Sequence, residues 1–230
     1  SDSEDAMEIW VNETLADGYY DIAAIDALLA ALETKLSGTD DNLSAADAEL
    51  AKQIELGEAE LNYIYTVFEA LTRAESPTDL AEIREELYHS GYASRMKNYT
   101  AMKQQAPKPL KFKTTNGYTV LCGKNNKQND FITTKLASKT DWWFHVKNLP
   151  GSHVLLQTDG EEPPEIDFTE AAEIAAFYSK AEGDNIAVDY THAKNVKKPA
   201  GAKPGFVIYH VNWSAYVTPN PKKINEMLLK

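Results

Sequence analysis

The stretch DWWFHVKNLPGSHVLL (Asp141–Leu156) predicts a β-hairpin. Apolar and aromatic runs flank a turn-forming Asn-Leu-Pro-Gly sequence, which is the pattern of two short strands joined by a tight connection. We expect the strands at Trp142–Val146 and His153–Leu156, around Pro150-Gly151. A hairpin at the centre of the chain points to an antiparallel sheet.

Side chains alternate between the two faces of a strand, so the first strand divides into two sets. One set is purely apolar and reads as core: Trp142, Phe144 and Val146. The other is amphipathic and ends in a lysine: Trp143, His145 and Lys147. We predict that the second set forms a surface, with burial of both tryptophans as the alternative. On this prediction, Trp143→Ala should impair binding more than folding, and Trp142→Ala should do the reverse.

Charge is distributed unevenly along the 230 residues. Residues 1–106 carry 7 Lys and Arg against 22 Asp and Glu, whereas residues 107–230 carry 16 against 13. All positive charge in the second part is lysine. This asymmetry predicts two units with different roles: an acidic helical arm (1–106) and a second domain (107–230). No apolar run approaches the roughly 20 residues of a membrane span, and the start of the chain has no signal-peptide pattern.

Helical periodicity dominates the first unit. Apolar residues from Ile25 to Leu36 keep the spacing of one helix face, and those from Leu50 to Leu71 alternate four and three apart, as in a coiled-coil seam. We predict an antiparallel helical hairpin, followed by a shorter helix that begins at Ser76-Pro77 and stops near Gly91.

Prolines at 107 and 109 mark the boundary, and strand-like periodicity follows it. We expect a strand at Tyr118–Cys122, a short helix capped by Asn126 and a helix over residues 168–180. Further strands are expected at 186–190, 206–211 and 215–218. The predicted class is α+β, with a mostly antiparallel sheet and two or three helices.

The sequence does not predict a metal site or a catalytic site. The soft candidate ligands are Cys122, His145, His153, His192 and His210. His145 and His153 could face each other across the hairpin, but zinc takes three or four ligands. Ser152 and His153 are adjacent and point to opposite faces of a strand, so they do not form a nucleophile–base pair. No phosphate-binding glycine motif is present. We expect no cofactor, no metal and no enzymatic activity in this chain.

Two basic segments instead favour nucleic acid. GKNNKQND (123–130) supplies lysines and amides before a helix, and THAKNVKKPAGAKPG (191–205) supplies four lysines in a loop. The aromatic run at 142–144 could stack on unpaired bases. A solvated lysine loop and a protein-interaction module remain the alternatives.

At these residues the sequence closely resembles a known family. GKNNKQNDFITTKLASKTDWWFHVKNLPGSHVLL and VDYTHAKNVKKPAGAKPGFVIY resemble the carboxy-terminal NFACT-R domain of the NFACT family, over residues 107–230. IREELYHSGY (83–92) resembles the end of the family's coiled-coil middle segment. Some bacterial members carry the name fibronectin-binding protein A.

The resemblance implies an RNA-binding module of a cytoplasmic ribosome-associated quality control factor. Such factors bind large ribosomal subunits obstructed by peptidyl-tRNA, and recruit alanyl-tRNA for carboxy-terminal tailing without mRNA. Expected partners are the large subunit, rRNA or tRNA, and a ribosomal protein at the acidic arm. The implied RNA-binding residues are Lys124, Asn125, Asn126, Lys127, Gln128, Asn129, Trp143, His145, Lys147, His153, Lys194, Lys197, Lys198 and Lys203.

The sequence departs from the family pattern in one respect. The family's amino-terminal NFACT-N domain and helix-hairpin-helix region have no counterpart in these residues, so we expect that this chain alone does not support tailing. The alternative function is a surface-displayed adhesin that binds fibronectin, or another protein-interaction module.

Overall fold

Two helices precede the sheet in the computed structural model, which describes residues 45–92 and 106–229. Helix α3 (Ala45–Thr72) contains the predicted seam, and α4 (Pro77–His89) begins at the proline expected in a first helical turn. Gly91 follows α4 with φ +86°, a left-handed conformation that ends helices. The helix predicted at residues 25–36 lies outside the described residues, so the coiled-coil hairpin stays a prediction. No helix in the described part is long and apolar enough to cross a membrane.

The described residues divide into two compact units, and the division falls within α3 and α4. One unit contains residues 45–64 and 87–92, where the ring of Tyr63 stacks on Tyr92 and its hydroxyl donates to Ser90 Oγ at 3.0 Å. The other contains residues 65–86 and 106–229. Residues 65–86 therefore pack with a domain that begins after the proline boundary in the sequence.

A six-stranded sheet forms the centre of the second unit, and every strand pair is antiparallel. The spatial order is β1-β2-β4-β3-β5-β6. The strands are β1 (Leu110–Lys113), β2 (Thr119–Cys122), β3 (Trp142–Val146), β4 (Val154–Gln157), β5 (Ile186–His192) and β6 (Trp213–Val217). The α+β class and the predicted hairpin, β3 with β4, are confirmed.

Three features of the structure differ from the prediction. The expected strand at 206–211 is wrong, because only Ile208 pairs there, in an isolated bridge with Lys197. The loop around it is too rich in Pro and Gly to form a ladder. Strand β1 and helix α7 (Pro221–Met227) were not predicted. Both are short, and α7 depends on local capping, with Asn220 accepting from the backbone N–H groups of Lys222 and Lys223.

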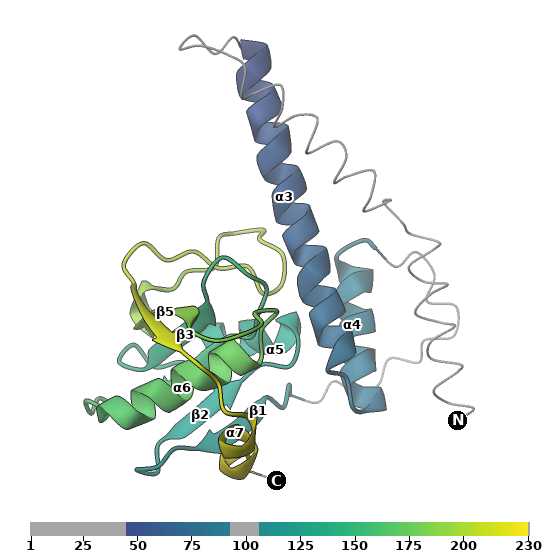
Figure 1. The fold of residues 1–230 in the computed structure, drawn as a ribbon. Helices are drawn as coiled ribbons and strands as arrows, with labels where there is room; N and C mark the ends of the chain where they lie inside the picture. The colour runs from purple at the N-terminus through teal and green to yellow at the C-terminus, as the bar shows by residue number, and fades with distance from the viewer. Residues whose placement is uncertain (1–44, 93–105, 230) are drawn as a thin grey trace. The chain divides into compact units, whose positions relative to one another are not determined.

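Each face of the sheet is covered. Helix α6 (Glu165–Phe177) lies across one face (Figure 1), where it packs on the set that contains Trp142, Phe144 and Val146. The other face is covered by α5 (Asn126–Phe131), the π-helix η1 (Ile132–Leu136) and residues 193–209, which include the 3-10 turn η2 (Ala193–Asn195). The hydrophobic cluster beneath this second cover includes Trp143.

Burial of Trp143 corrects the prediction that its side of the strand is a surface. Alternation assigns the faces as predicted, yet Trp143 is only 1% exposed and Trp142 is 8% exposed. The physical reason is that a sheet covered on both faces requires apolar side chains in both sets. Neither tryptophan is available to stack on a base.

Candidate nucleic-acid interface

The cover over Trp143 is strongly basic. Residues 131–140 and 193–213 contain no Asp or Glu. Their lysines, which we call the basic face, are Lys135, Lys139, Lys194, Lys197, Lys198 and Lys203. The two segments are brought together because Ala137, Ala193 and Val196 pack on one cluster, and because the N–H of Ala193 donates to the carbonyl of Asp141 at 2.9 Å.

Helix α6, which covers the other face of the sheet, is acidic. It carries four carboxylates and no Lys or Arg: Glu165, Asp167, Glu170 and Glu173. Of these, Asp167 and Glu170 are buried, and Lys223 Nζ lies 3.2 Å from Glu170 Oε1 and 3.9 Å from Glu173 Oε2. An anionic polymer is attracted to the carboxylate-free segments that carry the basic face. Lys135 and Lys139 were missed as candidate residues. A ten-residue stretch without any carboxylate was the signal that could have identified them.

The six lysines differ in how they are used. Lys198 Nζ lies 2.6 Å from Asp130 Oδ2 and donates to the carbonyl of Lys203 at 2.9 Å. The other carboxylate oxygen of Asp130 accepts from the N–H of Gly205 at 3.0 Å. Lys198 therefore holds the loop in shape. Lys194 and Lys197 are exposed and form no ion pair with any residue in the described ranges, so their ammonium groups are available to phosphates.

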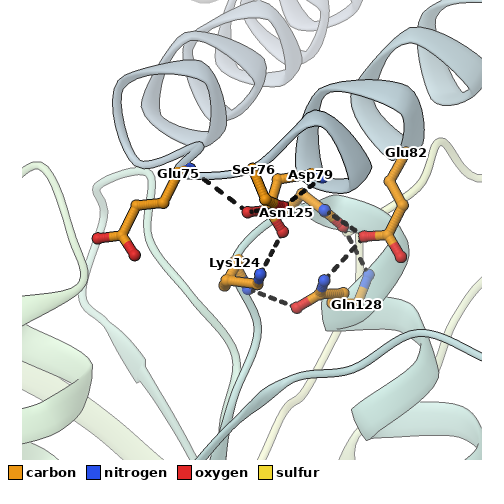
Figure 2. Close-up of polar contacts among 7 residues, drawn as sticks. All are labelled: Glu75, Ser76, Asp79, Glu82, Lys124, Asn125 and Gln128. Atoms are coloured by element: carbon orange, nitrogen blue, oxygen red, sulfur yellow. Dashed lines mark hydrogen bonds and ion pairs between the residues drawn. The ribbon is translucent and has the colours of Figure 1, made fainter.

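Residues 124–128 of the segment GKNNKQND contact helix α4. Figure 2 shows Asp79 and Glu82 directed at the end of β2 and the start of α5. Glu82 Oε2 accepts from Asn125 Nδ2 and from Gln128 Nε2, each at 2.8 Å. We call these contacts the α4 clasp. Its members are Asp79, Glu82, Glu85 and Glu86 of α4 with Lys124, Asn125, Asn126, Lys127 and Gln128.

Charge and hydrogen bonding are matched throughout the clasp. Lys124 pairs with Asp79, and Lys127 Nζ lies 2.5 Å from Glu85 Oε2. Asn126 Nδ2 donates to Glu86 Oε1 at 2.9 Å and to Thr66 Oγ1 at 2.6 Å. Burial alone would raise the pKa of Asp79, but hydrogen bonds from Lys124 and Ser76 outweigh it and lower this pKa below its usual value.

The clasp amides are almost fully buried. Asn125 and Asn126 are each 2% exposed and Gln128 is 1% exposed. Asn125 also caps α5, accepting from the N–H of Gln128 at 2.9 Å. Asn129 is likewise internal, and its Oδ1 accepts from the N–H of His153 at 3.0 Å. The amides serve the fold in this structure, and the RNA-binding role that the resemblance implies for them stays a prediction.

His145 and His153 face each other across the hairpin, as predicted, with ring centroids 5.6 Å apart. His153 Nδ1 lies 2.8 Å from Thr133 Oγ1, which accepts from Trp143 Nε1 at 3.2 Å. Burial lowers the pKa of both histidines, and His145 lowers that of His153 further. Both rings are therefore neutral near pH 7. No group of three or more metal-ligating side chains occurs among the described residues.

The neutral histidines predict a stability loss in mild acid. For His153 the pKa in the folded protein lies well below 6.5, so the unfolded chain binds more protons once the pH falls below about 6.5. The stability that His153 contributes is complete above that pH. It is lost as the pH falls towards the pKa in the folded protein, at up to about 1.4 kcal/mol per pH unit. Urea unfolding between pH 7.5 and 5 should show this decline, and His153→Gln should flatten it. Parallel curves for the two proteins would contradict the assignment.

Cys122 is a core residue. It is fully buried, and burial raises the pKa of its thiol to about 12. A nucleophilic cysteine requires a lowered pKa and solvent access. Ser152 Oγ donates to the carbonyl of Gly123 at 2.5 Å, so it too is engaged in the fold.

Lys147 lies apart from the loop lysines. It follows β3, is exposed, and its Nζ donates to Ser214 Oγ at 3.1 Å, with Asp189 Oδ1 at 3.7 Å. The structure thus separates the predicted residues into three groups: the α4 clasp, a buried group around Trp143 and the exposed lysines.

The six-stranded antiparallel sheet with helices packed on it defines an α+β domain with a candidate anion-binding face, and two family models identify it further. One, described as the NFACT protein RNA binding domain, matches residues 108–210. The other, described as the NFACT N-terminal and middle domains, matches residues 41–106. The chain belongs to the NFACT family and contains its RNA-binding domain.

Known relatives agree with this assignment. The chain is 44% identical over 177 residues to the Rqc2 homolog RqcH of Bacillus subtilis, covering 75% of this chain and 30% of that protein. It is 42% identical over 187 residues to RqcH of Streptococcus suis, covering 80% and 33%. The chain thus spans about a third of the length of these relatives.

A solved structure is also similar to this chain. The C-terminal part of the fibronectin/fibrinogen-binding protein from Streptococcus suis superposes with a TM-score of 0.83 at 32% identity. The match covers 98% of this chain and 100% of that one.

Proposed function

We propose that this chain is the RNA-binding part of a ribosome-associated quality control factor. In this proposal it helps the whole protein engage a large ribosomal subunit obstructed by peptidyl-tRNA and recruit alanyl-tRNA for carboxy-terminal tailing. The chain acts by binding, and the burial of Cys122 and Ser152 supports a non-catalytic role.

The observation that carries the proposal is the basic face. Six lysines lie in two segments that contain no carboxylate and that cover one side of the sheet. Binding of phosphates by lysines releases counterions, so affinity should fall steeply with salt. Membership of the NFACT family and the RqcH relatives supply the ribosomal context.

We expect the double variant Lys194→Ala/Lys197→Ala to weaken RNA binding and to reduce its salt dependence. Each lost phosphate contact should lower the slope of log affinity against log salt by about 0.7 for a single strand. Fluorescence anisotropy with labelled RNA over a salt series measures the slope, and co-sedimentation with large ribosomal subunits tests the biological target. Lys198 is left intact because it pairs with Asp130 and shapes the loop.

A matched control is Lys108→Ala/Lys222→Ala, which removes the same charge from two exposed lysines outside the basic face. It should retain nearly the wild-type slope. Equal losses in the two double variants would mean that RNA responds to net charge alone, and the basic face would then have no special role.

The acidic helices fit a protein contact better than an RNA contact. The α4 carboxylates are engaged in the clasp, whereas Glu49, Glu55 and Glu58 of α3 are exposed. We propose that this part of α3 contacts a basic ribosomal protein. The adhesin alternative is motivated by the name of the structural relative. Tight fibronectin binding by this chain, without affinity for RNA or ribosomes, would favour it.

A further inference from the structure

Lys197 and Ile208 form an isolated β-bridge in the cover over the sheet. The N–H of Lys197 donates to the carbonyl of Ile208 at 2.9 Å, and the N–H of Ile208 returns a bond to Lys197 at 2.8 Å. Val196, Val207 and Tyr209 pack inward on the cluster around Trp143. Alternation then directs Lys197 and Ile208 outward.

Phe206 lies two residues before Ile208, at the end of the lysine-bearing loop. It is exposed over 47% of its surface. Neither of the two clusters packed on the sheet includes Phe206. A single exposed aromatic residue is common on protein surfaces. This one is distinctive because it lies two residues from Ile208, the bridge partner of the exposed Lys197, in a segment without any carboxylate.

We propose that Phe206 and Lys197 together bind one unpaired nucleotide, with the base stacked on the Phe206 ring and a phosphate held by the Lys197 ammonium. This inference rests on the proposed RNA-binding function of the basic face, and it names the class of ligand. Bases within a duplex are stacked and paired, so an exposed aromatic ring selects single strands, loops or ends.

The cations of the domain predict that recognition tolerates different sequences. Residues 107–230 contain no arginine, and bidentate reading of base edges depends largely on the arginine fork. Lysine acts as a point charge towards phosphate. The pair therefore recognises an unpaired base next to a phosphate and not a particular base.

Anisotropy with a labelled single-stranded RNA of about ten nucleotides, against a blunt duplex of the same length, tests the proposal. Phe206→Ala should weaken single-strand binding by about 5- to 100-fold, because stacking contributes that much per base. Its salt slope should match wild type, since no counterion is released by stacking. Duplex affinity should not change. Phe206→Tyr, which keeps the aromatic ring, should bind the single strand with nearly wild-type affinity.

Phe206→Leu separates stacking from packing, because it keeps an apolar side chain without an aromatic face. It should fold like wild type and still lose single-strand affinity. Wild-type affinity in Phe206→Leu and Phe206→Ala, together with a loss in Lys194→Ala/Lys197→Ala, would overturn the stacking role and leave the proposed function standing. Absence of RNA binding by the wild-type chain would overturn both. An equal loss on duplex and single strand would also refute the selectivity for unpaired bases.

Discussion

Trp143→Ala should lower the free energy of unfolding by about 3–5 kcal/mol. The side chain is 1% exposed and fills the centre of the cluster formed with Leu121, Ile132 and Leu155. Its truncation leaves a cavity, and removes the donor to Thr133 Oγ1. The melting temperature of a domain of this size changes by about 2–4 °C for each kcal/mol of stability, so it should fall by roughly 6–20 °C. Urea unfolding and thermal melts measure the effect.

Two companion variants make this result interpretable. Tyr216 on β6 is 64% exposed, so Tyr216→Ala should change stability by no more than about 0.5 kcal/mol. Trp143→Phe keeps a ring but loses the indole N–H, and should cost less than Trp143→Ala. RNA affinity of Trp143→Ala, measured where it remains folded, should stay close to wild type. Normal stability with lost RNA binding would restore the surface role first predicted for Trp143.

Glu82→Ala should destabilise the second unit by about 2–6 kcal/mol. One carboxylate oxygen accepts from Asn125 and Gln128, each at 2.8 Å, and both amides are buried. Removing the acceptor leaves two buried amide N–H donors without this partner, and each such donor costs about 1–3 kcal/mol of stability. Denaturant unfolding followed by tryptophan fluorescence gives the free energy, and amide hydrogen exchange should show faster exchange across residues 124–129.

Glu85→Ala is the matched control for the clasp. The side chains of Lys127 and Glu85 are 30% and 17% exposed, so solvent reaches both, and Glu85→Ala should cost less than Glu82→Ala. Equal losses in the two variants would show that α4 contributes through charge alone. RNA affinity tests whether residues 124–129 contact RNA once the clasp is opened. A gain on opening the clasp with Glu82→Ala would assign RNA contact to residues 124–129, whereas unchanged affinity is expected if the basic face binds RNA.

Local signals were sufficient for much of the fold. The Asn-Leu-Pro-Gly turn between alternating apolar runs specified the hairpin β3–β4, and the four-three spacing from Leu50 to Leu71 specified a helix. These patterns depend on neighbouring residues, which a single sequence displays. The loop from 206 to 211 was misread as a strand because its apolar residues serve the packing of Val207 and Tyr209 on the sheet.

The candidate site depended on contacts between distant residues. In GKNNKQND, lysines and amides predict an anion-binding segment, and the sequence offers no sign that Glu82 lies beside Gln128, 46 positions away. Likewise, Lys198 looks equivalent to Lys197 until Asp130 is found beside it.

By itself the sequence determined the hairpin, the alternation of Trp142 and Trp143, the helices α3, α4 and α6, and the supply of lysines without carboxylates. Only the tertiary structure decided that both faces of the sheet are covered, and which cations remain open to a ligand. The reason is physical: alternation assigns a side chain to a face, but burial depends on what packs against that face from elsewhere in the chain.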